Sequence, residues 1–288
     1  MRCSFADDPT LSPRLFTLLD RVFPGIGGAA AHARRLGGVW EEASTPFVHF
    51  ENGEAVAHVG VIELPLILMG KEARVGSIHG VAAHPDHRRR GHYRKVMEEA
   101  LEHCAGRFAT LVLTTEHPEY FSPFGFREVR EHRFILRGMG RNAPGGARLL
   151  DLSDSTDIAL LNRLLETREP VSRVVGVGPE KAVFCVNEGR RPLHYLPDLD
   201  TLLCLELEGR VLRLFDVVSP RLPALDAIVA RLPRPVDEVI LHFSPDRMGV
   251  RARSEAYLLD HDGPSHLMVR GGFPPEGGPF TLPRPART

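Results

Sequence analysis

Residues 79–94 read HGVAAHPDHRRRGHYR, and the fold of the N-terminal half follows from this stretch. The run from Arg74 to Ala83 predicts a strand, and Pro85 ends it. Beyond the arginines, apolar residues recur at helical spacing: Val96, Met97, Ala100, Leu101 and Cys104. The sequence therefore predicts a strand, a turn that contains Gly91, and a helix, in that order.

The turn before this helix has the composition of an anion-binding site. The first N–H groups of a helix have no partner within the helix, and the helix dipole favours an anion there. Gly91 lacks a Cβ and lets a phosphate approach the backbone closely. Four arginines add charge and bidentate donors: Arg88, Arg89, Arg90 and Arg94. Three consecutive arginines are more often a solvated surface, but their place between a strand and a helix favours phosphate binding.

The elements on either side extend this pattern. Helices are expected at residues 13–23 and 29–36, followed by antiparallel strands at 47–50, 55–64 and 74–83. After the helix, Thr110–Thr115 predicts a buried strand of β-branched residues and leucine. A short irregular or helical segment is expected at 117–125, and a closing strand pair or one long strand at 127–136. Gly138 to Gly146 is the expected linker.

Two of these segments resemble motifs of the GCN5-related N-acetyltransferase (GNAT) superfamily. Residues 81–91, VAAHPDHRRRG, are similar to its motif A, with Arg88 and Gly91 at the arginine and glycine positions. Tyr93 stands where the motif usually has glycine or alanine. Residues 117–126, HPEYFSPFGF, resemble motif B, in which an aromatic pair precedes Gly-Phe. The resemblance implies a GNAT fold, in which helices flank a mixed, mostly antiparallel central sheet.

The resemblance also implies acetyl-coenzyme A as co-substrate and direct attack by a primary amine of a small molecule or peptide. The pantetheine arm of acetyl-coenzyme A is expected along the end of the strand 74–83, and its pyrophosphate in the turn that contains Gly91. The residues implied are Val81, Ala82, Ala83, Arg88, Arg89, Arg90, Gly91, His92, Tyr93 and Arg94. A non-catalytic acyl-coenzyme A-binding sensor or scaffold is the alternative.

The proton-transfer groups are less defined. In the motif-B pattern the tyrosine lies four residues before the glycine, where this chain has Phe121. Tyr120, one residue earlier, is the candidate acid for the leaving thiolate, because its phenol carries a proton that Phe121 lacks. It could instead be an aromatic wall. The candidate bases lie near the strand ends: Glu116, His117, His79 and Glu63.

The second half predicts the same order of elements without the arginine turn. A helix is expected at 154–167, strands at 201–207 and 210–218, a helix at 222–232, and a strand at 238–243. We therefore expect a GNAT domain over 1–140 and a degenerate GNAT-like domain over 147–288. This arrangement resembles the enhanced-intracellular-survival acetyltransferases without their sterol-carrier-like domain. The second domain is expected to wall the substrate cleft or to form a homodimer.

Composition excludes several other classes. The net charge of -1 argues against nucleic acid as the partner. The four cysteines have no CxxC spacing, and the histidines at 79, 84, 87 and 92 match no zinc signature, so neither a disulfide framework nor a metal site is expected. No signal peptide or membrane-length apolar run is visible, which predicts a cytoplasmic protein.

Overall fold

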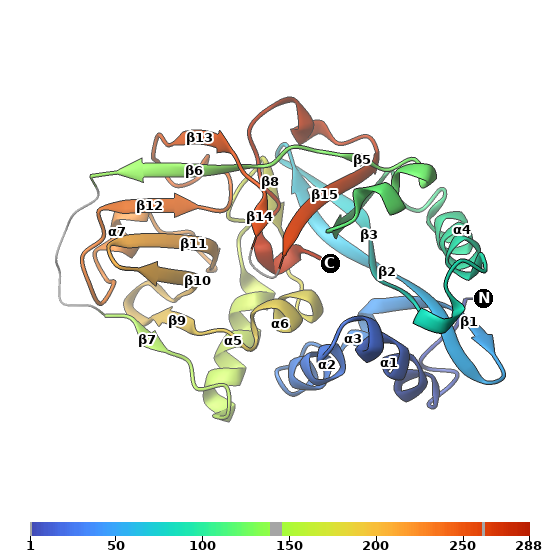
Figure 1. Ribbon diagram of the computed structural model, residues 1–288. Helices are drawn as coiled ribbons and strands as arrows, with labels where there is room; N and C mark the ends of the chain where they lie inside the picture. The colour runs from blue at the N-terminus through green and yellow to red at the C-terminus, as the bar shows by residue number, and fades with distance from the viewer. Residues whose placement is uncertain (1, 139–145, 261–262) are drawn as a thin grey trace.

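The computed structural model describes residues 2–138, 146–260 and 263–288. They form two mixed, mostly antiparallel sheets with helices packed against them, which confirms the predicted fold class (Figure 1). The expected linker at 138–146 falls almost entirely outside the described residues. No helix within these ranges is long and apolar enough to cross a membrane.

The first sheet is built mainly from the N-terminal half. Its order is β1 (Ser44–Glu51), β2 (Glu54–Leu68), β3 (Lys71–Ala83), β4 (Thr110–Thr115), β15 (Pro264–Gly271) and β14 (Leu259–Asp260), with β5 (Arg127–Glu128) pairing with β15 and β8 (Val175–Val177) with β2. The first three strands are antiparallel, as predicted, and β4 is parallel to β3. A parallel pair requires a long crossover connection, usually a helix, and α4 (His92–Cys104) provides it.

Helices cover both faces of this sheet. Because neighbouring strand residues point to opposite faces, Phe47 packs in the cluster under α4, whereas Val48 packs with α1 (Leu11–Val22). The residues that predicted α4 are the ones it buries: Val96, Met97, Ala100, Leu101 and Cys104. The helices α2 (Ile26–Arg35) and α3 (Trp40–Ala43) complete this half.

The second sheet repeats the core of the first. Its order is β13 (Arg253–Ala256), β6 (His132–Arg137), β12 (Glu238–Leu241), β11 (Val211–Val218), β10 (Thr201–Glu208), β9 (Leu193–Leu196) and β7 (Arg148–Leu149). The β10–β11 hairpin is antiparallel, and α7 (Leu225–Val229) leads into β12, which is parallel to β11. The same order holds for β2, β3, α4 and β4, so the repeat predicted from the sequence is present in the topology.

The two sheets exchange strands. The expectation that 127–136 closes the first sheet is wrong: only Arg127–Glu128 pairs there, and β6 pairs with β12 and β13 of the second sheet. The edge of β4 is instead covered by β15, in register from His266 opposite Thr115 to Gly271 opposite Thr110. Figure 1 shows green β6 among the orange strands and red β15 beside the first sheet. The sheets therefore do not separate at the expected boundary of 140 and 147.

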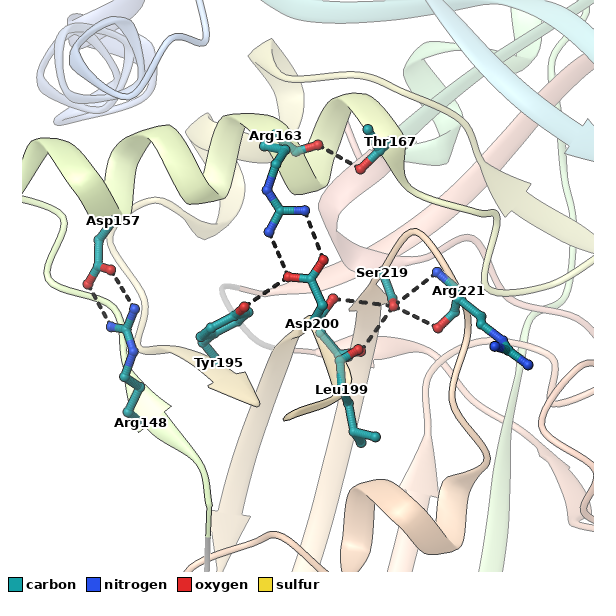
Figure 2. A network of polar contacts seen from close by, with 10 residues as sticks. Arg148, Asp157, Arg163, Thr167, Tyr195, Leu199, Asp200, Ser219 and Arg221 are labelled. Carbon is teal, nitrogen blue, oxygen red and sulfur yellow. Dashed lines mark hydrogen bonds and ion pairs between the residues drawn. The ribbon is translucent and has the colours of Figure 1, made fainter. Parts of the chain in front are cut away.

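Helix α5 (Ser155–Thr167) is held on the second sheet by a polar network (Figure 2). Asp154 caps the helix by accepting from the N–H groups of Thr156 and Asp157. The Asp157 carboxylate accepts from Arg148 at 2.6 and 2.8 Å. Farther along the helix, the Arg163 guanidinium donates to Asp200 at 2.6 and 2.8 Å. Helix and sheet are thus joined by ion pairs as well as by apolar contacts.

The pair of Asp157 and Arg148 predicts an acid-sensitive contribution to stability. Hydrogen bonds from Arg148 lower the pKa of Asp157 from the usual 3.8 to about 2. The stabilisation is therefore complete above about pH 4 and is lost as the pH falls toward 2. We expect Asp157→Asn to lower the free energy of unfolding by about 1 kcal/mol at pH 7, because Arg148 is half exposed.

Urea denaturation at several pH values checks this prediction. The difference between wild type and Asp157→Asn should shrink below pH 4, while Glu72→Gln, at an exposed position of β3, should match wild type throughout. A difference that does not change with pH would contradict the assignment.

Candidate functional site

The strands β3 and β4 are hydrogen-bonded over a very short length. Their register contains only the pairs of Gly76 with Leu111 and Ser77 with Val112. Beyond Ser77 and Val112, Thr288 lies between the strands: its carbonyl oxygen accepts from the N–H of Thr114 at 3.1 Å and from its hydroxyl at 2.7 Å. The Thr288 hydroxyl contacts that of Ser77. The strands therefore diverge toward their carboxyl ends.

A β-bulge lies on the β3 side of this opening. His58 is opposite Ala82 and Gly60 is opposite His79, so two residues of β3 face one residue of β2. One of the two is Gly80, with a φ of 55° that favours glycine. The His58 Nδ1–H donates to the Gly80 carbonyl at 2.6 Å. Burial lowers the pKa of His58 to about 4, so the ring is neutral at pH 7. The hydrogen bond from His58 holds the Gly80 carbonyl in its orientation within the bulge.

The predicted turn follows immediately. Gly91 is the N-cap of α4 and has a φ of 84°, and Arg89 is also left-handed, with a φ of 62°. Arg88, Arg89 and Arg90 are exposed. Within the described part of the chain, no acceptor receives the backbone N–H groups of residues 89–94. These N–H groups are free for an anion, and the guanidinium groups of the three exposed arginines lie in the same turn.

The side chains of His92 and Tyr93 face the protein and not the turn. His92 Nε2 lies 3.0 Å from Glu51 Oε1. The Tyr93 hydroxyl donates to the Tyr120 carbonyl at 3.0 Å, and burial raises the pKa of Tyr93. Tyr93 therefore does not crowd the turn, although it replaces a small residue of the family motif. For both residues only the backbone is available to a phosphate.

The motif-B segment places its two candidate aromatic residues differently. Tyr120 ends the short 3₁₀ helix η2 (Pro118–Tyr120), its side chain is 56% exposed, and its ring lies 5.0 Å from that of His117. Phe121 is 6% exposed and packs edge-on to Phe126. The residue at the usual tyrosine position is therefore part of the core, and its neighbour presents the hydroxyl.

The four candidate bases divide into two groups. Glu116 and His117 are exposed at the end of β4, and the Glu116 carboxylate lies against Gly263. Glu63 is opposite Gly76, at the paired end of β3 and β4, and is bound to Arg74.

His79 is only 4% exposed and lies inside the protein. Its Nε2 is 2.9 Å from the Ser44 hydroxyl, and its ring contacts Trp40 edge-on. Burial lowers the pKa of His79 well below its ordinary value, so the ring is a poor proton acceptor at neutral pH. The structure thus brings only Glu116 and His117 to the diverging end of the strands.

Several residues of this region were not expected from the sequence. Ser77, Thr114 and Thr288 meet in the opening, although Thr288 lies 211 positions from Ser77. No local pattern marks the segment 284–288 as a partner of β3 and β4. His58, which fixes the bulge, is likewise part of a long apolar strand with no signal of its own.

Comparison with known proteins gives the same assignment for the N-terminal part. Residues 10–129 match the family model described as an acetyltransferase (GNAT) domain. A search of curated protein sequences found no match.

Solved structures share the fold over nearly the whole chain. A probable N-acyltransferase of unknown function from Enterococcus faecalis V583 has a TM-score of 0.61 at 11% identity, covering 95% of this chain and 72% of that one. Eis1 from Mycobacterium abscessus has a TM-score of 0.55 at 16% identity, covering 91% and 72%. A GCN5-related N-acetyltransferase from Kribbella flavida has a TM-score of 0.54 at 15% identity, covering 90% and 68%.

These likenesses cover both sheets, and the family match coincides with the elements that carry the bulge, the opened strands and the arginine turn. Residues 10–129 therefore match the acetyltransferase (GNAT) domain family, and the chain as a whole shares its fold with solved structures described as acyl- and acetyltransferases.

Proposed function

We propose that this protein transfers the acetyl group of acetyl-coenzyme A to a primary amine. The observation that carries the proposal is the opening of β3 and β4 directly beside the unpaired N–H groups of residues 89–94. An extended ligand with an anionic group at one end fits this arrangement. The pyrophosphate, pantetheine and thioester of acetyl-coenzyme A have this order.

The turn would hold the pyrophosphate. Its N–H groups and the N-terminus of α4 provide donors, and the exposed guanidinium groups of Arg88, Arg89 and Arg90 neutralise the charge. The pantetheine arm would follow residues 81–83, where Val81 and Ala83 are partly exposed after the bulge. The thioester would then lie at the diverging ends of β3 and β4.

The reaction would proceed by direct attack. The amine nitrogen bonds to the thioester carbon, the C–S bond breaks, and the electron pair leaves on sulfur. We assign Glu116 as acceptor of the amine proton, since it is exposed at the end of β4. Tyr120 is the exposed phenol of motif B and would protonate the thiolate. The hydrogen bond from Tyr93 to its carbonyl ties η2 to the start of α4, which would position it.

One observation favours a second function. The buried Phe121 occupies the position where the family has its acid, so the chain could bind acyl-coenzyme A without turning it over. In either case, the second half of the chain, residues 147–288, would have one of two roles. It would line the wall of the cleft with β15 and residues 284–288, or it would form a homodimer. The two functions differ in the release of free thiol.

Gly91→Val tests the cofactor site. A β-branched residue is strained at a φ of 84°, although nothing lies within 4 Å of the added Cβ. The strain of about 1–2 kcal/mol and the misdirected N–H groups should weaken acetyl-coenzyme A binding at least about tenfold, measured by calorimetry. Gly106→Val is the matched control, because Gly106 is left-handed and uncrowded at the other end of α4. Equal affinities of wild type and Gly91→Val would remove the assignment.

Tyr120→Phe tests the catalytic assignment. Thiol release from acetyl-coenzyme A should be measured against a panel of primary amines, and the best acceptor used for kinetics. We expect kcat to fall about 10²-fold with little change in KM for acetyl-coenzyme A, because the proton donor is lost while binding is kept. Tyr257→Phe, in the second half, should behave as wild type.

The other outcomes are equally informative. An unchanged kcat in Tyr120→Phe would exclude Tyr120 as the acid. Binding of acetyl-coenzyme A without thiol release for any amine would support the non-catalytic function.

A further inference from the structure

Three histidines surround one carboxylate beside the arginine turn. Glu51 lies at the end of β1, and its Oε1 is 3.0 Å from His92 Nε2 and 4.0 Å from His49 Nε2. Its other oxygen, Oε2, accepts from His87 Nδ1–H at 2.9 Å. One atom each of His49, Glu51 and His92 lies within 4.8 Å of the others, and all three side chains are partly buried.

Hydrogen bonding does not fully account for this cluster. His92 Nε2 is buried and has no hydrogen-bond partner within the described residues, because its contact with Glu51 is close but poorly aligned. The rings of His49 and His92 are stacked, with centroids 4.6 Å apart and planes 22° apart. Two imidazoles thus direct a ring nitrogen toward the same carboxylate oxygen.

The donor atoms are of the kind that a transition metal binds. Zinc binds imidazole nitrogen and carboxylate oxygen at about 2.0–2.2 Å, so two ligand atoms of one ion are about 3.0–3.5 Å apart. The contact of His92 with Glu51 is already in this range, whereas His49 Nε2, at 4.0 Å from Glu51 Oε1, would have to move closer when an ion binds. Nitrogen-rich donor sets select zinc-like ions over magnesium and calcium.

We propose that His49, Glu51 and His92 form a site for a zinc-class divalent cation. His87 would not bind the ion but would orient the Glu51 carboxylate through its hydrogen bond. Metal ligands are commonly oriented by such hydrogen-bond partners. A water molecule would complete a tetrahedral site. The site is independent of the proposed enzymatic function, because none of its ligands has to contact acetyl-coenzyme A through its side chain.

The consequence for the fold is a cross-link. His92 is the first residue of α4, and His49 and Glu51 are on β1, some 40 residues earlier in the chain. A bound ion would tie the start of α4, and with it the turn at Gly91, to the edge of the first sheet. Arg90, whose guanidinium is 3.8 Å from Glu51, would be released from the carboxylate and become available to a phosphate.

Calorimetry with zinc chloride on the full chain, without an affinity tag and after chelator treatment, tests the proposal. We expect one zinc ion per chain, and Co²⁺ in its place should give the visible absorption of a tetrahedral nitrogen and oxygen site. Glu51→Gln, which keeps the size of the side chain, and His49→Gln should each lower the affinity at least about tenfold. Zinc should also raise the midpoint of thermal unfolding in wild type more than in either variant.

His103→Gln is the matched control, since His103 lies at the other end of α4 and packs on Phe47. It should bind zinc as wild type does. Magnesium should give no saturable heat. Failure of the wild-type chain to bind zinc, Co²⁺ or Ni²⁺ would overturn the proposal. The same holds if Glu51→Gln and His49→Gln, shown to be folded by circular dichroism, bind zinc with unchanged affinity.

Discussion

Two buried ion pairs hold the last residues of the chain in place, and much of the architecture depends on them. The Arg284 guanidinium donates to both oxygens of Glu188 at 2.8 Å, and its plane lies over the ring of Phe215. Arg287 donates to Glu131. All four charged side chains are almost fully buried, and removing one partner of such a pair typically costs about 3–5 kcal/mol. Residues 284–288 are therefore a fixed part of the core.

These pairs lie where the two sheets exchange strands. Glu131 is between β5 and β6, at the point where the chain passes from the first sheet to the second, and it also accepts from the Leu282 N–H. Glu188 ends α6 (Ala182–Glu188), which packs against the end of the chain. With both pairs formed, β15 covers the edge of β4 and Thr288 lies in the opening. The exchange thus closes one sheet edge and shapes the candidate site.

In the candidate site, backbone and side chains have separate tasks. The bulge at Gly80, the left-handed Arg89 and Gly91, and the free N–H groups of residues 89–94 present the backbone to a ligand. The side chains of His92 and Tyr93 turn inward and fix the turn against Glu51 and η2. An anion site of this kind needs little net charge, which agrees with a chain whose formal charge is -1.

The amino-acid sequence determined the local elements and their chemistry. Three features are properties of neighbouring residues, so each could be predicted and was found. They are the helical spacing of apolar residues in α4, the β-branched and alternating apolar residues in the strands, and the arginine turn with Gly91. The order of strand, strand, helix and strand in the second half was also visible. The exposure of Tyr120 and the burial of Phe121 and His79 could not be predicted. A local pattern does not say which distant residues will pack on a side chain.

Only the tertiary structure decided which distant segments meet. The edge of β4 could accept any strand of suitable pattern, and in the fold β15 covers it while Arg287, farther along the chain, meets Glu131. His49, Glu51 and His92 likewise converge because β1 and α4 pack together, not because of their spacing. Local patterns reflect backbone conformation over a few residues, whereas long-range pairing is decided by the total free energy of contacts that exist only once the chain has folded.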